Sequence, residues 1–504
     1  MTHLQSSGTV PIDIGSRLEL MVDDYLIEQM SGGAALHLHQ PTMREVVMVT
    51  DEPWEGNASL YRSVFHDGEI YRMYYGADQF NLAEGMVHSA HPGLQCYAES
   101  RDGIHWTRPA LGLVEFDGSR QNNIVLADGP MGETEIDADH IAVFKDDNPE
   151  CQPDATYKAI VRVRKPQAAL FALKSSDGIH FSLLFDQPIF TNMHFDSQNL
   201  AFWDGLRGEY RAYVRHFQGV VPDRKTSRYT SDHGVRGILT ATSKDFLNWT
   251  EPVWLNYPVA PSEQLYTNQI RPYERAPHIF MGFPMRYVDR GWTKQTDFLP
   301  ELELRRQRAA RSPRFGSVVT DGLFMSSRDG LNFKRWGEAF IRPGLRPQDN
   351  WVYGDNCIGW GILETESDLP GAPNELSIYA TESYWTGNSM NLRRYTLRLD
   401  GFVSVQAPLS GGEFVTKPLV FAGEQLVINY STSAAGSIRV EVQDEAGKPL
   451  EGLTLDDCPE IFGDALEQIV HWADGRGLGH LAGKPIRLRF ALRDADLYSI
   501  RFRP

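Results

Sequence analysis

The sequence predicts an all-β protein, a five-bladed β-propeller followed by a C-terminal β-sandwich. Three observations support this fold class: a turn signature that recurs along the chain, strand-like segments that recur between its copies, and a change of sequence texture near residue 405. The 504 residues, 41% of them hydrophobic, are enough for one large core or two. The 44 Gly and 29 Pro favour turn-rich β structure over helical bundles.

The turn signature consists of a serine, an aspartate two positions later and an aromatic residue four positions after the aspartate. It recurs at intervals of roughly 70 to 80 residues, a period typical of repeat architectures. Its four copies are Ser100–Trp106, Ser175–Phe181, Ser243–Trp249 and Ser327–Phe333. Aspartate can bond its own backbone and the following glycine tolerates positive φ, so each copy predicts a tight β-hairpin. Repeated units of several strands predict propeller blades, with a sandwich array as the alternative.

Strand-like segments recur at matching places in five units. They cover residues 68–76, 155–163, 208–216, 276–284 and 374–382, and a second apolar segment precedes each. The fifth unit ends at Asp400-Gly401-Phe402. Five blades are therefore expected over roughly residues 18–404.

Three further segments complete the expected organisation. Residues 17–28, RLELMVDDYLIE, are expected to pair near the end of the propeller and close the ring. Residues 288–316 interrupt the fourth unit as a charged, partly helical insertion. From about residue 405 the apolar and polar residues alternate, as in a half-solvated antiparallel sheet. We expect residues 1–404 to form the catalytic propeller and residues 405–504 the sandwich.

Composition narrows the partners and the compartment. A net charge of −17 argues against nucleic-acid binding. Four cysteines without zinc-like spacing are expected to be thiols in a reducing compartment. The N-terminus has no signal-like apolar run and the chain has no apolar stretch of membrane-spanning length. We expect a cytoplasmic protein without a membrane partner or cofactor, whose self-association stays open.

Several stretches together resemble a known family. RLELMVDDYLIE, CYAESRDGIHW, the pair Asn122-Asn123, DGFVSV and RDADLYSIRF resemble the glycosyl-hydrolase-32-like proteins of bacteria, in the superfamily of invertases, levansucrases and arabinanases. The resemblance implies a propeller with a trailing β-sandwich and a glycosidase acting on a furanoside or small oligosaccharide. It also implies three carboxylates, one from each of the first three blades. The invertase motifs WMNDPNG, RDP and EC are absent from the sequence.

Carboxylates at the starts of the inner strands are the candidate catalytic residues. Glycoside cleavage needs one acid to protonate the leaving oxygen and one carboxylate as nucleophile or base. The choices are Glu55, Asp139 and Asp196, expected about 5 to 10 Å apart at one mouth of the channel. Asp137 competes with Asp139, and Glu382 is a reserve acid.

Polar and aromatic residues near the same strand starts are the candidate substrate ligands. They are Trp54, as a stacking platform, and His140, His194, Gln198, Glu263, Tyr266, Asn268, Arg271, Tyr353 and Asp355. No metal is expected, because the two histidines lack ligand spacing.

Two alternatives to a hydrolase stay open. A glycoside phosphorylase on the same scaffold would need a cationic phosphate site, which Arg271, Arg275 and Arg286 could supply. A non-catalytic carbohydrate-binding propeller would use the same acids only as hydrogen-bond acceptors.

Overall fold

A computed structural model describes residues 10–83, 86–165, 167–219, 234–473, 475 and 477–504. The chain divides into two compact units. One comprises residues 41–273 and 277–396, and the other residues 1–40, 274–276 and 397–504. Within the described residues, no helix has the length and apolar character needed to cross a membrane.

The first unit is a five-bladed propeller, and each blade has four main antiparallel strands, to which β12 (Ile124–Ala127) adds in blade one and β13 (Gly129–Met131) and β18 (Phe190–Thr191) add in blade two. Blade one contains β6 (Ser63–His66), β7 (Tyr71–Ala77), β10 (Leu94–Ser100) and β11 (Trp106–Thr107). Blade two contains β14 (Thr134–Lys145), β15 (Tyr157–Val163), β16 (Ala169–Ser175) and β17 (Ser182–Leu183). Blade three contains β19 (Leu200–Asp204), β20 (Glu209–Gln218), β21 (Val235–Ser243) and β22 (Val253–Trp254). Blade four contains β23 (Arg271–Tyr273), β24 (Ala276–Gly282), β27 (Met325–Ser327) and β28 (Lys334–Arg335).

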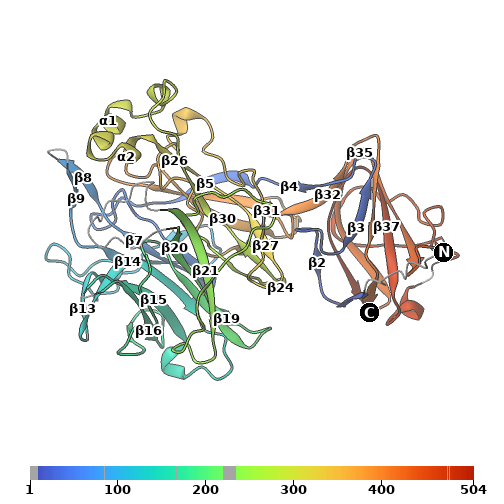
Figure 1. Cartoon of the computed structure of the whole chain (residues 1–504), viewed down its shortest axis with the longest axis horizontal. Helices are drawn as coiled ribbons and strands as arrows, with labels where there is room; N and C mark the ends of the chain where they lie inside the picture. The colour runs from blue at the N-terminus through green and yellow to red at the C-terminus, as the bar shows by residue number, and fades with distance from the viewer. Residues whose placement is uncertain (1–9, 84–85, 166, 220–233, 474, 476) are drawn as a thin grey trace. The chain divides into compact units, whose positions relative to one another are not determined.

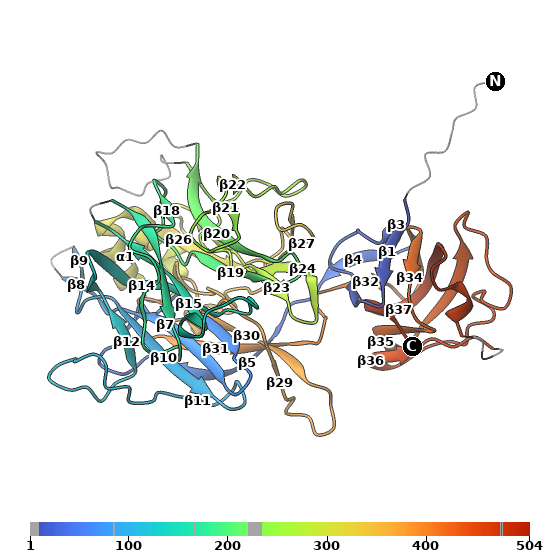
Figure 2. The ribbon, with the colours of Figure 1, turned by 90° about the horizontal axis from the view of Figure 1, so that it is seen from below.

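Blade five is completed by a strand from the N-terminal part of the chain. It contains β29 (Leu363–Thr365), β30 (Glu375–Glu382), β31 (Asn391–Arg398) and β5 (Thr42–Val49). β5 pairs antiparallel with β31, from Asn391 opposite Val49 to Thr396 opposite Thr42. The blue β5 and the orange β31 lie side by side in Figure 1 and Figure 2. This pairing closes the ring.

Several shorter elements decorate the blades. The strands are β8 (Phe80–Ala83), β9 (Met86–Ser89), β12 (Ile124–Ala127), β13 (Gly129–Met131), β18 (Phe190–Thr191), β25 (Met285–Asp289) and β26 (Val318–Gly322). The expected insertion at 288–316 carries α1 (Leu302–Arg311) and the start of α2 (Pro313–Ser317). Proline at the first position of α2 suits a helix start, because that backbone position needs no N–H donor.

The four copies of the turn signature occupy equivalent places, after the third strand of blades one to four. In every copy the serine hydroxyl donates to the aspartate Oδ1 at 2.9 to 3.0 Å. That Oδ1 also accepts two backbone N–H groups at 2.7 to 2.9 Å. The glycine after the aspartate has φ near +75°, and in the third copy Phe246 takes that position with φ 68°. The predicted hairpins are confirmed.

A buried tyrosine ties three of these hairpins to the preceding blade. Tyr74 of blade one donates to the carbonyl oxygen of Gly178 at 2.8 Å, and Tyr213 of blade three to that of Gly330 at 2.9 Å. Tyr379 of blade five donates to Gly103 of blade one across the closure. The third hairpin differs: Phe246 packs against Phe144 and Tyr210 instead.

The second unit is a β-sandwich built on one extended sheet. Its strands are β1 (Ile12–Gly15), β2 (Glu19–Leu20), β3 (Ile27–Ser31), β4 (Ala35–Leu38), β32 (Val403–Ala407), β33 (Gly412–Thr416), β34 (Leu419–Phe421), β35 (Gln425–Asp444), β36 (Asp464–Ile469) and β37 (Ile486–Arg503). The long strands β35 and β37 pair along most of their length, with register shifts that let them bend. Their inward residues form one apolar core with residues of the N-terminal strands.

The N-terminal segment corrects two sequence expectations. Residues 17–28 do not close the propeller, because β2 pairs with β37 and β3 pairs with β33 in the sandwich sheet. Figure 2 shows β3 and β4 beside β32 and β37. The boundary placed at residue 404 also differs, since residues 1–40 belong to the sandwich unit. The alternating pattern of these strands suits either sheet, and sequence alone does not choose the partner.

Replacing Tyr213 by Phe should lower the free energy of unfolding of the propeller by about 1 to 2 kcal/mol, because the Gly330 carbonyl loses its donor inside the fold. Chemical denaturation of the full chain measures this cost. Tyr257→Phe is the matched control, since the buried Tyr257 hydroxyl has no hydrogen-bond partner among the described residues. An equal cost for both substitutions would show that the contact between blades contributes nothing.

Candidate active site

A pocket of about 230 Å³ lies in the propeller unit, where residues from different blades meet. Carboxylates, one imidazole, two guanidinium groups and a ring of aromatic side chains line it. The lining residues are Ala58, Leu60, Tyr61, Phe80, Val87, Asp139, His140, Asp196, Arg236, Tyr266, Arg314, Phe315, Tyr353, Tyr384 and Trp385.

A bulge in β14 turns Asp139 and His140 into the pocket. The pairing of β14 with β15 shifts register between Asp137 and Ala142, so β14 carries extra residues there. Bulges of this kind re-aim side chains and are common beside active sites. Gly76 permits the close approach of this segment, because a Cβ at Gly76 would lie 2.4 Å from the Asp139 carbonyl oxygen.

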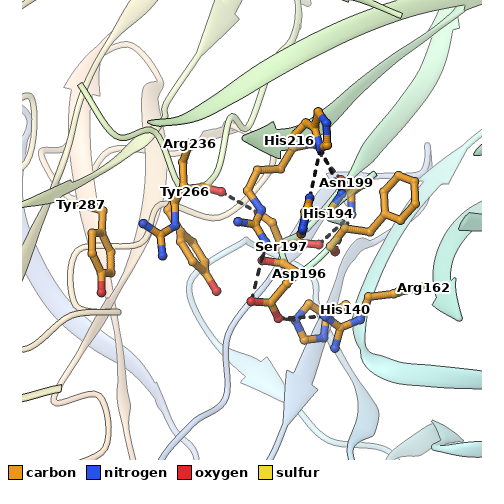
Figure 3. A network of polar contacts seen from close by, with 12 residues as sticks. His140, Arg162, His194, Asp196, Ser197, Asn199, His216, Arg236, Tyr266 and Tyr287 are labelled. Atoms are coloured by element: carbon orange, nitrogen blue, oxygen red, sulfur yellow. Dashed lines mark hydrogen bonds and ion pairs between the residues drawn. The ribbon is translucent and has the colours of Figure 1, made fainter. Parts of the chain in front are cut away.

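His140 connects two carboxylates at the base of the pocket. Its Nδ1 donates to Asp139 Oδ1 at 2.5 Å, and its Nε2 lies 3.4 Å from Asp196 Oδ1 (Figure 3). The Tyr61 ring lies 4.7 Å from the imidazole, between ring centroids. The two aspartates therefore contact opposite nitrogens of one ring.

Arginines surround this trio. Arg162 donates to Asp196 Oδ1 at 2.8 Å and also pairs with Asp137. Arg215 donates to the Asp196 backbone oxygen at 2.7 Å, and its guanidinium lies 3.6 Å from the Asp196 carboxylate. Asp196 is thus an anion held by two guanidinium groups and an imidazole.

These surroundings separate the pKa values of the two aspartates. Burial raises the pKa of Asp139 to about 6, against the lowering effect of His140. Burial acts in the same direction on Asp196, but the hydrogen bond from His140 and the charges of Arg162 and Arg215 hold its pKa well below the usual range. Burial and Arg162 lower the pKa of His140, yet Asp139 and Asp137 raise it well above 6.5. Near neutral pH the imidazole is charged, Asp196 is ionised and Asp139 is close to its titration point.

Asp137, Asp139 and His140 have the spacing of a metal-ligand group. One potential ligand atom from each lies within 4.8 Å of the others. However, one Asp137 oxygen already accepts from Arg164 at 2.6 Å and pairs with Arg162. A metal would have to compete with these guanidinium groups and with the proton on His140. The donor set therefore fits an ion-pair network better than a cation site.

Aromatic side chains form a wall of the pocket. The Tyr61 and Tyr266 hydroxyls are 3.1 Å apart, and the rings of Tyr353 and Phe315 stack at 5.6 Å between centroids. Backbone contacts hold this wall in place: the buried Asp355 carboxylate accepts the N–H of Tyr384 at 2.7 Å. Aromatic faces suit the apolar faces of sugar rings.

The structure brings five sequence-predicted site residues to the pocket: Asp139, His140, Asp196, Tyr266 and Tyr353. It does not bring Glu55 there. Glu55 is fully buried, and its carboxylate accepts from Tyr75 and from Arg108 Nε, the latter at 2.7 Å. Its neighbour Trp54 donates to Asn123 at 2.7 Å and is not among the described residues that line the pocket.

The remaining predicted ligands also lie outside the pocket lining. Gln198 and Asn268 are buried, and Gln198 Nε2 donates to the Tyr61 carbonyl at 2.9 Å. Asp355 is buried behind the aromatic wall. Arg271 is half-buried at the start of β23.

Two further predicted ligands, Glu263 and His194, have other partners. Glu263 pairs with Arg286 and Arg335. His194 stacks on His216, which borders a separate pocket of about 520 Å³ lined by the segment around β18 and by blade three.

The phosphate-site arginines suggested by the sequence are not on the pocket either. Arg286 pairs with Asp321 and Glu263. Arg275 pairs with Asp400, and both residues belong to the second compact unit and not to the propeller unit. Sequence reasoning missed the arginines that do line the pocket, Arg236 and Arg314, and the aromatic pair Tyr384-Trp385. Arg314 and Phe315 belong to the insertion 288–316, whose interruption of the repeat was the available signal.

Comparisons with known proteins give only distant similarities. No family model matches the sequence, and a search of curated proteins finds no match. Similar solved structures include an N-acetylgalactosamine deacetylase from F. plautii, with a TM-score of 0.41 and 12% identity over 72% of this chain and 94% of that chain. A thermostable family-43 glycoside hydrolase has a TM-score of 0.40 and 11% identity, over 69% and 92%. An endo-arabinase from Bacteroides thetaiotaomicron has a TM-score of 0.40 and 9% identity, over 70% and 98%. The resemblance to glycosyl-hydrolase-32-like proteins stays a prediction.

Replacing Glu55 by Gln should lower the free energy of unfolding by about 2 kcal/mol and leave the pocket chemistry intact, because the carboxylate holds Arg108 inside the fold. Asp51→Asn is the control: Asp51 lies 3.7 Å from the same guanidinium, but its side chain is 66% exposed, so its loss should cost little. Denaturation and a turnover assay on the same samples check this. A stable Glu55→Gln protein that has lost turnover would return Glu55 to the catalytic residues.

Proposed function

We propose that the protein is a glycoside hydrolase in which Asp139 donates a proton to the leaving oxygen and Asp196 acts as the anionic carboxylate. One observation carries this proposal: two aspartates contact opposite nitrogens of a single imidazole in a pocket, and their pKa values are shifted in opposite directions. Such separation is how two carboxyl groups take acid and base roles at one pH.

The order of events follows from the protonation states. A glycoside stacks against the aromatic wall with its scissile oxygen toward Asp139. Asp139 transfers its proton to that oxygen as the bond to the anomeric carbon breaks. Asp196 faces the positive charge that develops on the sugar ring and serves either as nucleophile or as base for a water molecule. An imidazole between the carboxylates suits the separation of roughly 5 to 9.5 Å used by glycosidases.

His140 and Arg162 would act as positioning residues. The charged imidazole donates to Asp139 and forms an ion pair with Asp196 at 3.4 Å, which fixes the relative placement of the two carboxylates. Arg162 and Arg215 keep Asp196 ionised throughout the reaction. After proton transfer, the new negative charge on Asp139 faces the imidazolium, which stabilises it.

Replacing Asp139 by Asn should reduce hydrolysis of glycosides with poor leaving groups by a factor of about 100 or more, because the proton donor is lost. A dinitrophenyl glycoside of the same sugar needs no protonation of its leaving group and should lose far less. A panel of nitrophenyl and dinitrophenyl glycosides with purified protein measures both. The wild-type rate should fall as pH rises through about 6, where Asp139 loses its proton, and this limb should vanish in the variant.

Asp196→Asn provides the matched comparison, since it should slow both classes of substrate alike. Near wild-type turnover of Asp139→Asn on poor leaving groups would exclude Asp139 as the acid. Absence of any hydrolysis over the panel, with sugar binding intact, would favour the non-catalytic binding propeller.

A further inference from the structure

Arg236 is a buried cation on the pocket wall. It lies in β21, is only 6% exposed and lines the pocket. Its guanidinium carbon lies 4.3 Å from the centroid of the Tyr287 ring, 5.2 Å from that of Phe217 and 5.7 Å from that of Tyr266. The side chain is therefore packed among aromatic rings, where water cannot solvate its charge fully.

The hydrogen-bonding groups of Arg236 are mostly unused. Nη1 donates to Gln264 Oε1 at 2.5 Å, and the buried Nε has no hydrogen-bond partner among the described residues. Among the residues that the structure describes, no carboxylate forms an ion pair with Arg236. A guanidinium offers five donors, and a buried one without an anion is costly. Arg305 and Arg308 are also buried, but they donate to backbone carbonyls and do not line the pocket.

Other positive groups lie close to Arg236. Burial lowers its pKa, and the charges of Arg215 and Arg314 act in the same direction. Arg314 lines the same pocket and donates to the Tyr287 hydroxyl at 3.2 Å. Asp196, a carboxylate of the same pocket, already faces Arg162, Arg215 and His140. In a chain with a net charge of −17, this pocket concentrates cations.

Arg236 lies apart from the His140 and Arg162 side of the site. In Figure 3, Arg236 and Tyr287 lie on the other side of Asp196 from His140 and Arg162. Asp139, Asp196 and Arg236 line the same pocket, so a ligand with its reacting oxygen at Asp139 can also reach Arg236. A carboxylate or phosphate there could accept two parallel hydrogen bonds from the guanidinium fork.

We propose that this pocket takes an anionic carbohydrate, whose carboxylate or phosphate group is bound by Arg236 together with Arg314 while the reacting oxygen faces Asp139. This substrate class rests on the proposed function, because it assumes that the pocket binds a sugar. The shared chemistry is an oxyanion. It can belong to a uronic acid or a sugar phosphate, or be inorganic phosphate that enters as a co-substrate.

Calorimetric titration with the full chain tests the proposal. Galactose, glucose, their uronic acids, the corresponding sugar phosphates and inorganic phosphate are compared at neutral pH and low salt. At least one anionic ligand should bind about tenfold or more tightly than its neutral counterpart. Arg236→Gln should remove that preference, so that anionic and neutral counterparts bind with about equal affinity. Arg236→Lys, which keeps the charge but loses the fork, should retain part of it.

Lys244→Gln is the charge-matched control. Lys244 follows the same strand, its side chain is 72% exposed, and its loss should leave every affinity unchanged. Equal affinity for neutral and anionic sugars, or an anion preference that survives in a folded Arg236→Gln protein, would overturn the proposal. If neutral glycosides are hydrolysed at a rate that does not depend on Arg236, and no anion is preferred, the anion site is excluded and the proposed hydrolase activity is retained. Anion binding that depends on Arg236, without hydrolysis of any glycoside, would support the anion site and contradict the hydrolase.

Discussion

The contact between each hairpin and the preceding blade is the constraint on which the propeller depends. The serine and aspartate of each turn bond the local backbone, so the turn presents a carbonyl group in a fixed place. In three of the blades a tyrosine hydroxyl from the previous sheet meets that carbonyl, including across the closure between blades five and one. The third hairpin keeps the turn without the tyrosine, and Phe246 packs against Phe144 of the preceding blade instead. With β5 completing the last sheet, the ring has a fixed circumference, and the starts of the inner strands converge.

The site exploits this convergence through a local departure from regular pairing. The bulge in β14 presents Asp139 and His140 where a regular strand would present only one of two consecutive side chains. His140 is then placed to reach Asp196, which precedes the first strand of the next blade. The charged groups around each aspartate then set its protonation state. Two guanidinium groups and an imidazolium hold Asp196 ionised. Asp139 contacts the imidazolium and lies 3.9 Å from Arg164, but its burial favours the neutral form. One ring of sheets thus yields two aspartates with different protonation.

The sequence predicts the parts of this arrangement that follow from local chemistry. The hairpins are encoded by Ser, Asp and Gly at fixed spacing, and their period indicates five blades. Asp196 precedes an inner strand as the positional rule requires, whereas Asp139, selected by the same rule, lies inside β14 at its bulge. Glu55 satisfies the same positional rule, but Arg108, distant in sequence, takes its carboxylate. Residues 17–28 have an alternating pattern that fits either the propeller or the sandwich sheet. In the structure their strand β2 pairs with β37, from the other end of the chain. Arg236 carries no motif at all, and only the fold shows that it lines the pocket.

Neutron diffraction from crystals of the wild-type protein, one set below pH 6 and one above, would test the central claim most directly, because it locates the protons that define the roles of the two aspartates. The account predicts hydrogen on both nitrogens of His140 at either pH, none on Asp196, and a carboxylic hydrogen on Asp139 that is present below pH 6 and lost above it. A neutral His140, or a hydrogen carried by Asp196 in place of Asp139, would contradict it.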